Sequence, residues 1–271
     1  MKAAAIQMVS ATSWPHNRDQ ALGLLQEAAD AGAELAVLPE YFCMMGRKDT
    51  DKLALAEQPG RGPVQDFLAG AAQRLGLWIA GGTLPMAGPD AQHVYNSHCV
   101  YGPDGQCVAR YDKIHLFRYA NERESYDESR VITAGREAVQ FELPSRDGQR
   151  WTVGLSVCYD LRFPELYRQH AAAGAHLLLV PSAFTHTTGQ AHWELLLRAR
   201  AVENLAFVLA AAQGGVHENG RHTWGHSMLV HPWGQVLAQQ AQGPGVVLAE
   251  LDFAALTQAR AQLPALQHRV C

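Results

Sequence analysis

Apolar runs and amphipathic stretches alternate along most of the chain. The short runs, rich in Ala, Val, Leu and Ile, have the length of buried strands, and the longer stretches have apolar positions three and four residues apart, as in a helix. Helices are predicted over 17–31, 63–75, 164–174, 189–204 and 253–262. Strands are predicted over 3–8, 34–39, 77–83, 94–101, 106–111, 151–157, 176–181, 206–212, 226–231, 235–239 and 246–251. This alternation predicts an α/β fold.

The chain also repeats itself. Residues 28–42, AADAGAELAVLPEYF, match residues 170–184, HAAAGAHLLLVPSAF, in the Ala-Gly-Ala turn, the apolar strand, the Pro and the final Phe. A second pair, YGPDGQCVA at 101–109 and VHPWGQVLA at 230–238, places Pro-x-Gly-Gln between two strands, which predicts hairpins. We therefore predict two similar halves whose sheets pack face to face with helices outside. This is a four-layer α-β-β-α sandwich with an internal pseudo-two-fold repeat, formed as a single domain over 1–271.

The least regular stretch is 118–137, RYANERESYDESRVITAGRE, which is rich in charged and aromatic residues and has no clear period. A loop of this length inside a compact domain is usually functional or mobile. We predict that it forms a flap over a site.

Composition narrows the class of protein. The 271 residues are 48% hydrophobic, which allows a substantial core, and the net charge is −4. The sequence has no basic patch, so we expect no nucleic-acid partner, and it has no apolar run of about 18 residues, so we expect no membrane span. Gln7 interrupts the apolar run at the N-terminus, which predicts a buried strand there instead of a secretory signal.

The cysteines and histidines give no sign of a disulfide framework or a metal site. The five cysteines are odd in number and form no C-x-x-C motif, so we expect free thiols and a cytoplasmic location. The thirteen histidines are scattered without metal-ligand spacing. The sequence also lacks a Walker loop, a dinucleotide fingerprint and an H-E-x-x-H motif, so we expect no metal and no cofactor.

Three residues that could take part in catalysis lie at the ends of predicted strands. Glu40 follows the strand of the first repeat, at the place where the second repeat has Ser182. The carboxyl ends of strands are where α/β folds place their sites. Lys113 ends the second strand of a hairpin. Cys158 lies between a strand and Pro164, which suits the first turn of a helix, and such a strand-to-helix turn exposes a nucleophile.

Each of these residues alone has a plainer interpretation: an exposed Glu, an outward strand Lys and an inert buried thiol. Together they supply the groups that thiol-based hydrolysis needs. A thiol with a pKa near ~8.5 is a poor nucleophile until a base removes its proton. An ammonium group nearby stabilises the oxyanion that forms. We therefore predict Cys158 as nucleophile, Glu40 as base and Lys113 as oxyanion stabiliser.

Three motifs carry a family resemblance. LPE at 38–40, YDKIHLF at 111–117 and GLSVCYDLRFPE at 154–165 resemble, in order and separation, the signature blocks of the nitrilase, or carbon–nitrogen hydrolase, superfamily. The resemblance implies the α-β-β-α sandwich, a Glu–Lys–Cys triad and a thioester acyl-enzyme. It also implies that the backbone N–H of Tyr159 completes an oxyanion hole. A second glutamate of the family matches Glu128, which would orient Lys113 or the substrate amide.

The second half of the chain resembles the Nit branch of that superfamily. The segments are PSAFTHTTGQAHWELLLRARAVE at 181–203, AAAQGGVH at 210–217 and GHSMLVHPWG at 225–234. The last two favour deaminated glutathione over 2-oxoglutaramate as the small-molecule amide substrate. The resemblance also implies a homodimer formed near the Cys-bearing turn and the 189–204 helix. Two features depart from the Nit pattern: Gln190 replaces a common Pro, and the sequence given stops at 268–271, HRVC, short of the Arg-x-Asp-Leu-Tyr tail often seen.

Several alternatives stay open. Arg162, Thr187 and Thr188 could bind substrate carboxylates, but Arg162 could instead pair with Glu165 on the first helical turn. Phe184 could wall the site or simply pack in the core. Alternative activities are an ω-amidase acting on 2-oxoglutaramate and a nitrilase, both of which keep the triad. A non-catalytic binding protein with the same fold is a further alternative, which the intact Glu, Lys and Cys argue against.

Overall fold

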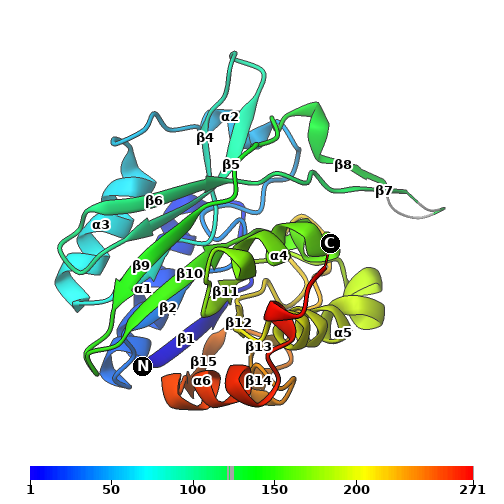
Figure 1. Ribbon diagram of the computed structural model, residues 1–271. Helices are drawn as coiled ribbons and strands as arrows, with labels where there is room; N and C mark the ends of the chain where they lie inside the picture. The colour runs from blue at the N-terminus through cyan, green and yellow to red at the C-terminus, as the bar shows by residue number, and fades with distance from the viewer. Residues whose placement is uncertain (121, 123–124, 271) are drawn as a thin grey trace.

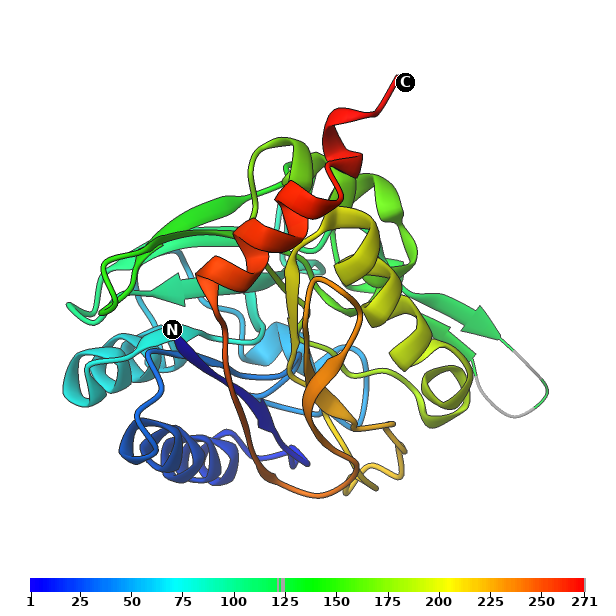
Figure 2. The same cartoon turned by 60° about the horizontal axis from the view of Figure 1, so that its bottom comes forward.

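The computed structural model describes residues 1–120, 122 and 125–270. In this part of the chain the strands form a seven-stranded sheet, a six-stranded sheet and a separate two-stranded hairpin. The two large sheets pack against each other and the long helices lie outside them (Figures 1 and 2). The predicted α-β-β-α sandwich is therefore confirmed.

The first half of the chain forms most of the seven-stranded sheet. Its strand order is β15-β1-β2-β3-β5-β4, with β6 also paired to β5. β1, β2 and β3 are parallel, and β5 runs antiparallel to β3. The elements are β1 (Lys2–Gln7), α1 (Trp14–Asp30), β2 (Leu35–Val37), α2 (Asp51–Ala54), α3 (Pro63–Leu75), β3 (Trp78–Ala80), β4 (Leu84–Ala87), β5 (Val94–Tyr101) and β6 (Cys107–Asp112).

The second half forms the other sheet, in the order β14-β13-β12-β11-β10-β9. Here too, three strands in succession, β10, β11 and β12, are parallel, and the next strand is antiparallel. The elements are β9 (Gln140–Pro144), β10 (Arg150–Leu155), α4 (Pro164–Ala172), β11 (Leu177–Leu179), α5 (His186–Asn204), β12 (Phe207–Ala210), β13 (Ser227–Val230) and β14 (Val236–Gln240). β15 (Gly245–Glu250) then returns to pair with β1, and α6 (Phe253–Gln262) follows.

The two halves share local detail as well as topology. β2 and β11 occupy matched positions of the aligned repeats. The hairpins β5–β6 and β13–β14 both shift register within the matched segments, between Val100 and Tyr101 and between Leu229 and Val230. A β-bulge at the same place in both copies is a feature that chance similarity of apolar strands would not produce. The predicted internal repeat is therefore confirmed.

The core around the first sheet lies in two layers because each central strand buries both faces. Odd-numbered residues of β1 and β2 pack in the core between the sheets, and even-numbered residues pack beneath α1 and α3. This period of two places successive side chains on opposite faces of the sheet. Strands buried on both sides read as continuous apolar runs, which is why these strands were visible in the sequence.

Most predicted elements match the structure, and several short elements were not predicted. α3 and α6 have the predicted bounds, whereas α2, β4 and β9 lack a clear hydrophobic period and were not predicted. α5 begins at His186, three residues before its predicted start. The reason is its cap: the Oγ1 of Thr185 accepts a hydrogen bond from the backbone N–H of Thr188.

The stretch expected to be an irregular flap contains a hairpin. β7 (Arg118–Ala120) pairs with β8 (Ser125–Asp127), and a 3₁₀ turn (Glu128–Arg130) follows; residues 121, 123 and 124 lie outside the described residues. The hairpin projects from the sandwich in both views (Figures 1 and 2). At its base the rings of Phe117 and Tyr126 lie 5.7 Å apart. This base lines the cavity described next.

Candidate active site

The carboxyl ends of strands from both sheets meet at one edge of the sandwich. Gln213, just after β12, pairs with Met8, just after β1. The Nε2 of Gln213 donates hydrogen bonds to the Oγ of Ser10 at 2.7 Å and to the backbone carbonyl of Glu40 at 3.0 Å. The buried Gln213 therefore fixes the main chain at the first candidate catalytic residue, at the strand edge where α/β folds form their sites.

Glu40 lies beyond β2 and is 1% exposed. Its Oε1 accepts hydrogen bonds from the Nζ of Lys113 and the Nδ2 of Asn96, both at 2.9 Å. Its Oε2 accepts the backbone N–H of Ala183 at 2.9 Å, and Glu40 lines the same cavity as Cys158. Burial raises the pKa of Glu40, although the charge of Lys113 opposes this. A carboxylate with a raised pKa is a better proton acceptor than an exposed one.

Lys113 is completely buried between two carboxylates. Its Nζ lies 2.9 Å from Oε1 of Glu40 and 2.8 Å from Oε2 of Glu128. Burial by itself would lower the pKa of Lys113, but the two carboxylates outweigh it and raise the pKa well above its usual value. Lys113 is therefore an ammonium group at neutral pH and cannot act as the base.

Glu128 begins the 3₁₀ turn after β8, and its side chain is 13% exposed. Besides Lys113, its carboxylate accepts the hydroxyl of Tyr41 and the backbone N–H of Phe117, both at 2.7 Å. Burial would raise the pKa of Glu128, but the charge of Lys113 lowers it overall. Glu128 therefore stays ionised and holds the ammonium group of Lys113 in place.

Cys158 is the first residue of a 3₁₀ turn (Cys158–Arg162) that directly precedes α4. Its φ is +50°, a left-handed conformation that is uncommon for a residue other than glycine and that is often found at functional sites. Its backbone N–H donates to the carbonyl of Pro181 at 3.0 Å. Burial raises the pKa of the thiol well above its ordinary value, and the charge of Glu40 adds to this effect. Cys158 is therefore a neutral thiol at rest, and a base has to remove its proton.

The buried carboxylate of Asp160 joins the cysteine turn to the lysine strand. Its Oδ2 accepts the backbone N–H of Val157 at 2.8 Å and the hydroxyl of Tyr111 at 2.7 Å. Its Oδ1 accepts the backbone N–H of His115 at 3.0 Å and lies 2.7 Å from the Nδ1 of the same residue. These contacts fix the position of Cys158 relative to Lys113.

Tyr159 follows the nucleophile within the 3₁₀ turn. The first N–H groups of a helical turn have no partner inside it, so the backbone N–H of Tyr159 stays a candidate oxyanion donor. The ring of Tyr159 packs edge-on against Phe117 at 5.2 Å and against Phe163 at 5.3 Å. These ring contacts stabilise the turn that carries the backbone N–H of Tyr159.

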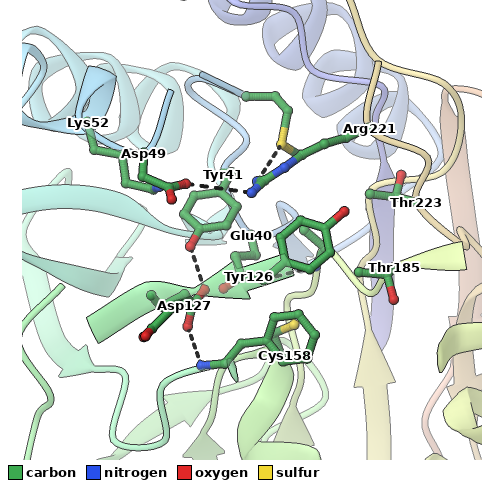
Figure 3. A pocket seen from close by; sticks show the side chains of 14 residues that line it. Glu40, Tyr41, Asp49, Lys52, Tyr126, Asp127, Cys158, Thr185, Arg221 and Thr223 are labelled. Carbon is green, nitrogen blue, oxygen red and sulfur yellow. Dashed lines mark hydrogen bonds and ion pairs between the residues drawn. The ribbon is translucent and has the colours of Figure 1, made fainter. Parts of the chain in front are cut away.

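Two cavities meet at Cys158. The larger, about 560 Å³ including its open mouth, is lined by Glu40, Glu128 and a group of charged residues. Figure 3 shows Glu40 and the charged Asp49, Lys52 and Arg221 around it. The smaller, about 210 Å³, lies beside it. The cavities share Phe117, Cys158, Ala183 and Thr185. Space on two sides of the thiol suits a substrate that continues in both directions from the bond that is broken.

Four of the five predicted substrate-binding residues line the smaller cavity: Tyr159, Arg162, Phe184 and Thr188. Thr187 is exposed and lines neither cavity, because the early start of α5 turns it toward solvent. The structure therefore does not bring Thr187 together with the other four.

Arg162 and Phe184 resolve two of the open alternatives. The Nη1 of Arg162 lies 3.2 Å from Nδ1 of His192, and its guanidinium lies 5.3 Å from the centre of the Phe184 ring. Among the ion pairs of the described residues, none joins Arg162 to Glu165. Phe184 is 5% exposed and packs 4.8 Å from Trp193, so it belongs to the core and walls the cavity at once.

Sequence reasoning missed several residues of the site. Asp160 stands inside a recognised motif, but its role depends on a strand from the other half. Asn96 lies in the middle of a predicted strand, where nothing in the local pattern marks it. Lys52 and Arg221 line the larger cavity from segments far apart in the chain. Only their meeting in space identifies these residues.

The sequence also led to expectations about disulfides, metal ions and membrane spans. In the part of the chain that the structure describes, Cys43, Cys99, Cys107 and Cys158 are free thiols, and Cys271 lies outside it. No three His, Cys, Asp or Glu side chains gather there in a way that could hold a metal ion. No helix there is both long and apolar enough to cross a membrane.

An α-β-β-α sandwich with a buried thiol, carboxylate and ammonium at its strand ends has the features of a cysteine-dependent hydrolase. Residues 2–261 match the model of the carbon–nitrogen hydrolase family. The chain belongs to this family, and it is an amide-hydrolysing enzyme.

Individual relatives agree with the Nit branch. A deaminated glutathione amidase of Synechocystis is 43% identical over 271 residues, which cover 99% of this chain and 97% of that protein. The crystal structure of the Caenorhabditis elegans NitFhit protein has a TM-score of 0.90 at 36% identity; the match covers 99% of this chain, which spans 65% of that longer one. Saccharomyces cerevisiae Nit3, a member of branch 10 of the nitrilase superfamily, has a TM-score of 0.87 at 28% identity over 100% of this chain and 97% of its own.

Proposed function

We propose that this enzyme hydrolyses a small carboxamide through a thioester on Cys158. One observation carries the proposal: the buried carboxylate of Glu40 lines the same cavity as Cys158 and lies 2.9 Å from the Nζ of Lys113. Glu40 acts as base and acid, Lys113 stabilises the oxyanion, and Glu128 holds Lys113 in place. These roles need no metal or cofactor.

The acylation half begins when Glu40 takes the proton of Cys158 as the sulfur bonds to the carbonyl carbon. The electron pair of the C=O bond moves to the oxygen, and the resulting oxyanion is held by Lys113 and the backbone N–H of Tyr159. When the C=O bond re-forms, the C–N bond breaks. Glu40 then gives its proton to the leaving amine, and the acyl group remains on Cys158 as a thioester.

The deacylation half repeats these steps with water. Glu40 removes a proton from the water as its oxygen adds to the thioester carbonyl, and the oxyanion again contacts Lys113. Collapse of this intermediate breaks the C–S bond. The sulfur of Cys158 regains its proton from Glu40, and the product leaves as a carboxylic acid. Lys113 stays charged throughout, as its raised pKa requires.

We propose deaminated glutathione as the substrate, with 2-oxoglutarate and cysteinylglycine as products. Support comes from the Synechocystis relative, which is named for this substrate, and from the cavities on both sides of Cys158. An ω-amidase or a nitrilase releases only ammonia and would need little space on the leaving-group side. The test is kcat/KM measured side by side on deaminated glutathione, 2-oxoglutaramate and a nitrile. Equal or reversed preference would reject deaminated glutathione as the substrate.

We also propose that the protein is a homodimer. Three large apolar side chains are exposed on α5 and the hairpin turn beside it: Leu195 at 69%, Val202 at 46% and Trp233 at 55%. The Nε of Arg198 on α5 donates to the carbonyl of Gly234, which holds that turn against the helix. Neighbouring exposed apolar side chains on a folded surface often mark a contact with another protein.

Two further assignments complete the proposal. The return of β15 to pair with β1 supports one domain over 1–271, since the last strand of the chain joins the first sheet. The free thiols of the described cysteines support a cytoplasmic location, where thiols are kept reduced.

A further inference from the structure

A group of three charged side chains lies at one end of the larger cavity and has no role in the reaction steps above. Lys52 on α2 and Arg221 both approach Asp49 (Figure 3). The Oδ1 of Asp49 lies 3.8 Å from the Nζ of Lys52 and 3.7 Å from the Nη2 of Arg221. Direct hydrogen bonds between such charges measure about 2.7–2.9 Å. Both pairs are therefore loose. Among the ion pairs of the described residues, Lys52 and Arg221 share the one carboxylate of Asp49.

The two cations, which share the larger cavity with the carboxylates of Glu40, Asp127 and Glu128, are partly withdrawn from solvent. The side chain of Lys52 is 13% exposed and that of Arg221 is 31% exposed. The Nζ of Lys52 lies 5.1 Å from the centre of the Tyr41 ring, and the Arg221 guanidinium lies 5.0 Å from that of Tyr126. Burying a charge without close partners costs free energy, and an anion that enters the cavity would offset this cost.

The reaction itself fixes which part of the substrate would reach these cations. The leaving nitrogen must approach Glu40 to receive its proton, and Glu40 lines the larger cavity but not the smaller. The leaving amine therefore extends into the larger cavity. The acyl chain extends into the smaller cavity, where Arg162 is available for its carboxylate. The volumes agree with this orientation, because a dipeptide leaving group is larger than a five-carbon acyl chain.

Building on the proposed function, we infer that Lys52 and Arg221 bind a carboxylate at the far end of the leaving group. The site would then select amides whose amine carries its own terminal carboxylate, as the dipeptide of deaminated glutathione does. This selection separates such substrates from primary amides, which share the acyl chain but release ammonia. Asp49 keeps the two cations in place, and its single carboxylate does not balance the charges of both.

The test compares two substrates with the same acyl group, deaminated glutathione and 2-oxoglutaramate. Lys52→Met and Arg221→Met should each lower kcat/KM for deaminated glutathione about 10- to 100-fold, mainly through KM, as expected for loss of one charged hydrogen bond. Both variants should hydrolyse 2-oxoglutaramate within about 2-fold of the wild type. That second rate also shows that the variants are folded. Arg18→Met, at an exposed arginine paired with Asp19, is the matched control and should change neither rate.

A modified substrate tests the same contact from the other side. Deaminated glutathione whose glycine carboxylate is converted to an amide should be a poorer substrate for the wild type by a similar factor, and Lys52→Met should not worsen it further. Asp49→Asn should keep or lower KM for deaminated glutathione.

Three results would overturn the inference. They are unchanged kinetics in Lys52→Met and Arg221→Met, equal losses on both substrates, and a rise in KM for Asp49→Asn as large as that for Lys52→Met. The last would mean that the three charges form a structural network. If the wild type itself shows no preference for deaminated glutathione, the proposed substrate fails, which is a separate outcome.

Discussion

The backbone N–H of Ala183 lies 2.9 Å from Oε2 of Glu40. Ala183 follows Ser182, the residue that takes the place of Glu40 in the second half of the chain. The base of one half is therefore held by the main chain of the other, across the packed sheets. Ser182 instead donates its hydroxyl to the carbonyl of Val180 in its own half, at 3.2 Å. The pseudo-two-fold symmetry ends at this point, and only one half carries a base.

Removal of the nucleophile should abolish turnover. Cys158→Ala should lower kcat by about 10³-fold or more, because no other group in the site can form the thioester. Iodoacetamide labelling with mass spectrometry checks this in a protein in which Cys107 and Cys271 are replaced by Ser. Cys107 is exposed, and its hydrogen bond with Cys99 lowers its pKa to about 7, so it would also react. Both replacements should keep activity. Label on a residue other than Cys158, together with lost activity, would contradict the mechanism.

The pH profile should report the raised pKa of Glu40. The base has to be ionised, and burial raises its pKa above 4.5, so activity should fall with decreasing pH at a higher pH than an exposed Glu would give. Lys113 should produce no loss below about pH 10, because its pKa is raised. The measurement is kcat/KM on 2-oxoglutaramate between pH 4 and pH 10. A profile that stays flat down to pH 4 would argue against Glu40 as the base.

Glu128→Gln should lower kcat by about 10²-fold while the protein remains folded. The change removes the charge that holds the Lys113 ammonium at 2.8 Å, so the oxyanion contact is misplaced. Tyr41→Phe is the graded comparison, since it removes one donor to Glu128 and keeps the ion pair. We expect less than a 10-fold loss for it. Equal losses in the two variants would show that the carboxylate charge is not what matters.

Asp160→Asn should destabilise the fold as well as the site. The carboxylate accepts the N–H of Val157, the hydroxyl of Tyr111 and the N–H of His115 in a buried place. The NH₂ group of an asparagine would face N–H or O–H groups that also donate, so hydrogen bonds would be lost in a buried place. The free energy of unfolding should therefore fall by about 2–4 kcal/mol. Urea unfolding followed by fluorescence measures this. Asp147→Asn, at a half-exposed carboxylate that pairs with the N-terminus, should change it by less than about 1 kcal/mol.

Leu195→Glu should convert the proposed dimer to a monomer. A charge placed among the apolar side chains of α5 would be desolvated on association. Analytical ultracentrifugation at several concentrations is the measurement. Val108→Glu, at an exposed apolar residue of the β5–β6 hairpin, is the control that should leave the mass unchanged. A wild type that sediments as a monomer throughout would remove the dimer proposal.

The sequence by itself determined the sandwich and the three central residues. Strands buried on both faces appear in the sequence as apolar runs. The two copies of β-α-β with a bulged hairpin appear as matching segments, so local sequence patterns are enough to predict the architecture. Glu40, Lys113 and Cys158 stand where strands end, and the ends of neighbouring strands lie together in such folds. Glu128 was found only through the resemblance, since no local pattern marks it.

The tertiary structure alone decided which residues surround them. Asn96 and Asp160 act through contacts with segments distant in the chain, and Thr187 is exposed and lines neither cavity. Lys52 and Arg221 lie far apart in the sequence and meet only across the larger cavity. A charge far from its partners in the chain looks like any solvated surface residue. Its burial and its shared carboxylate, which are set by packing, are what suggest a role in substrate choice.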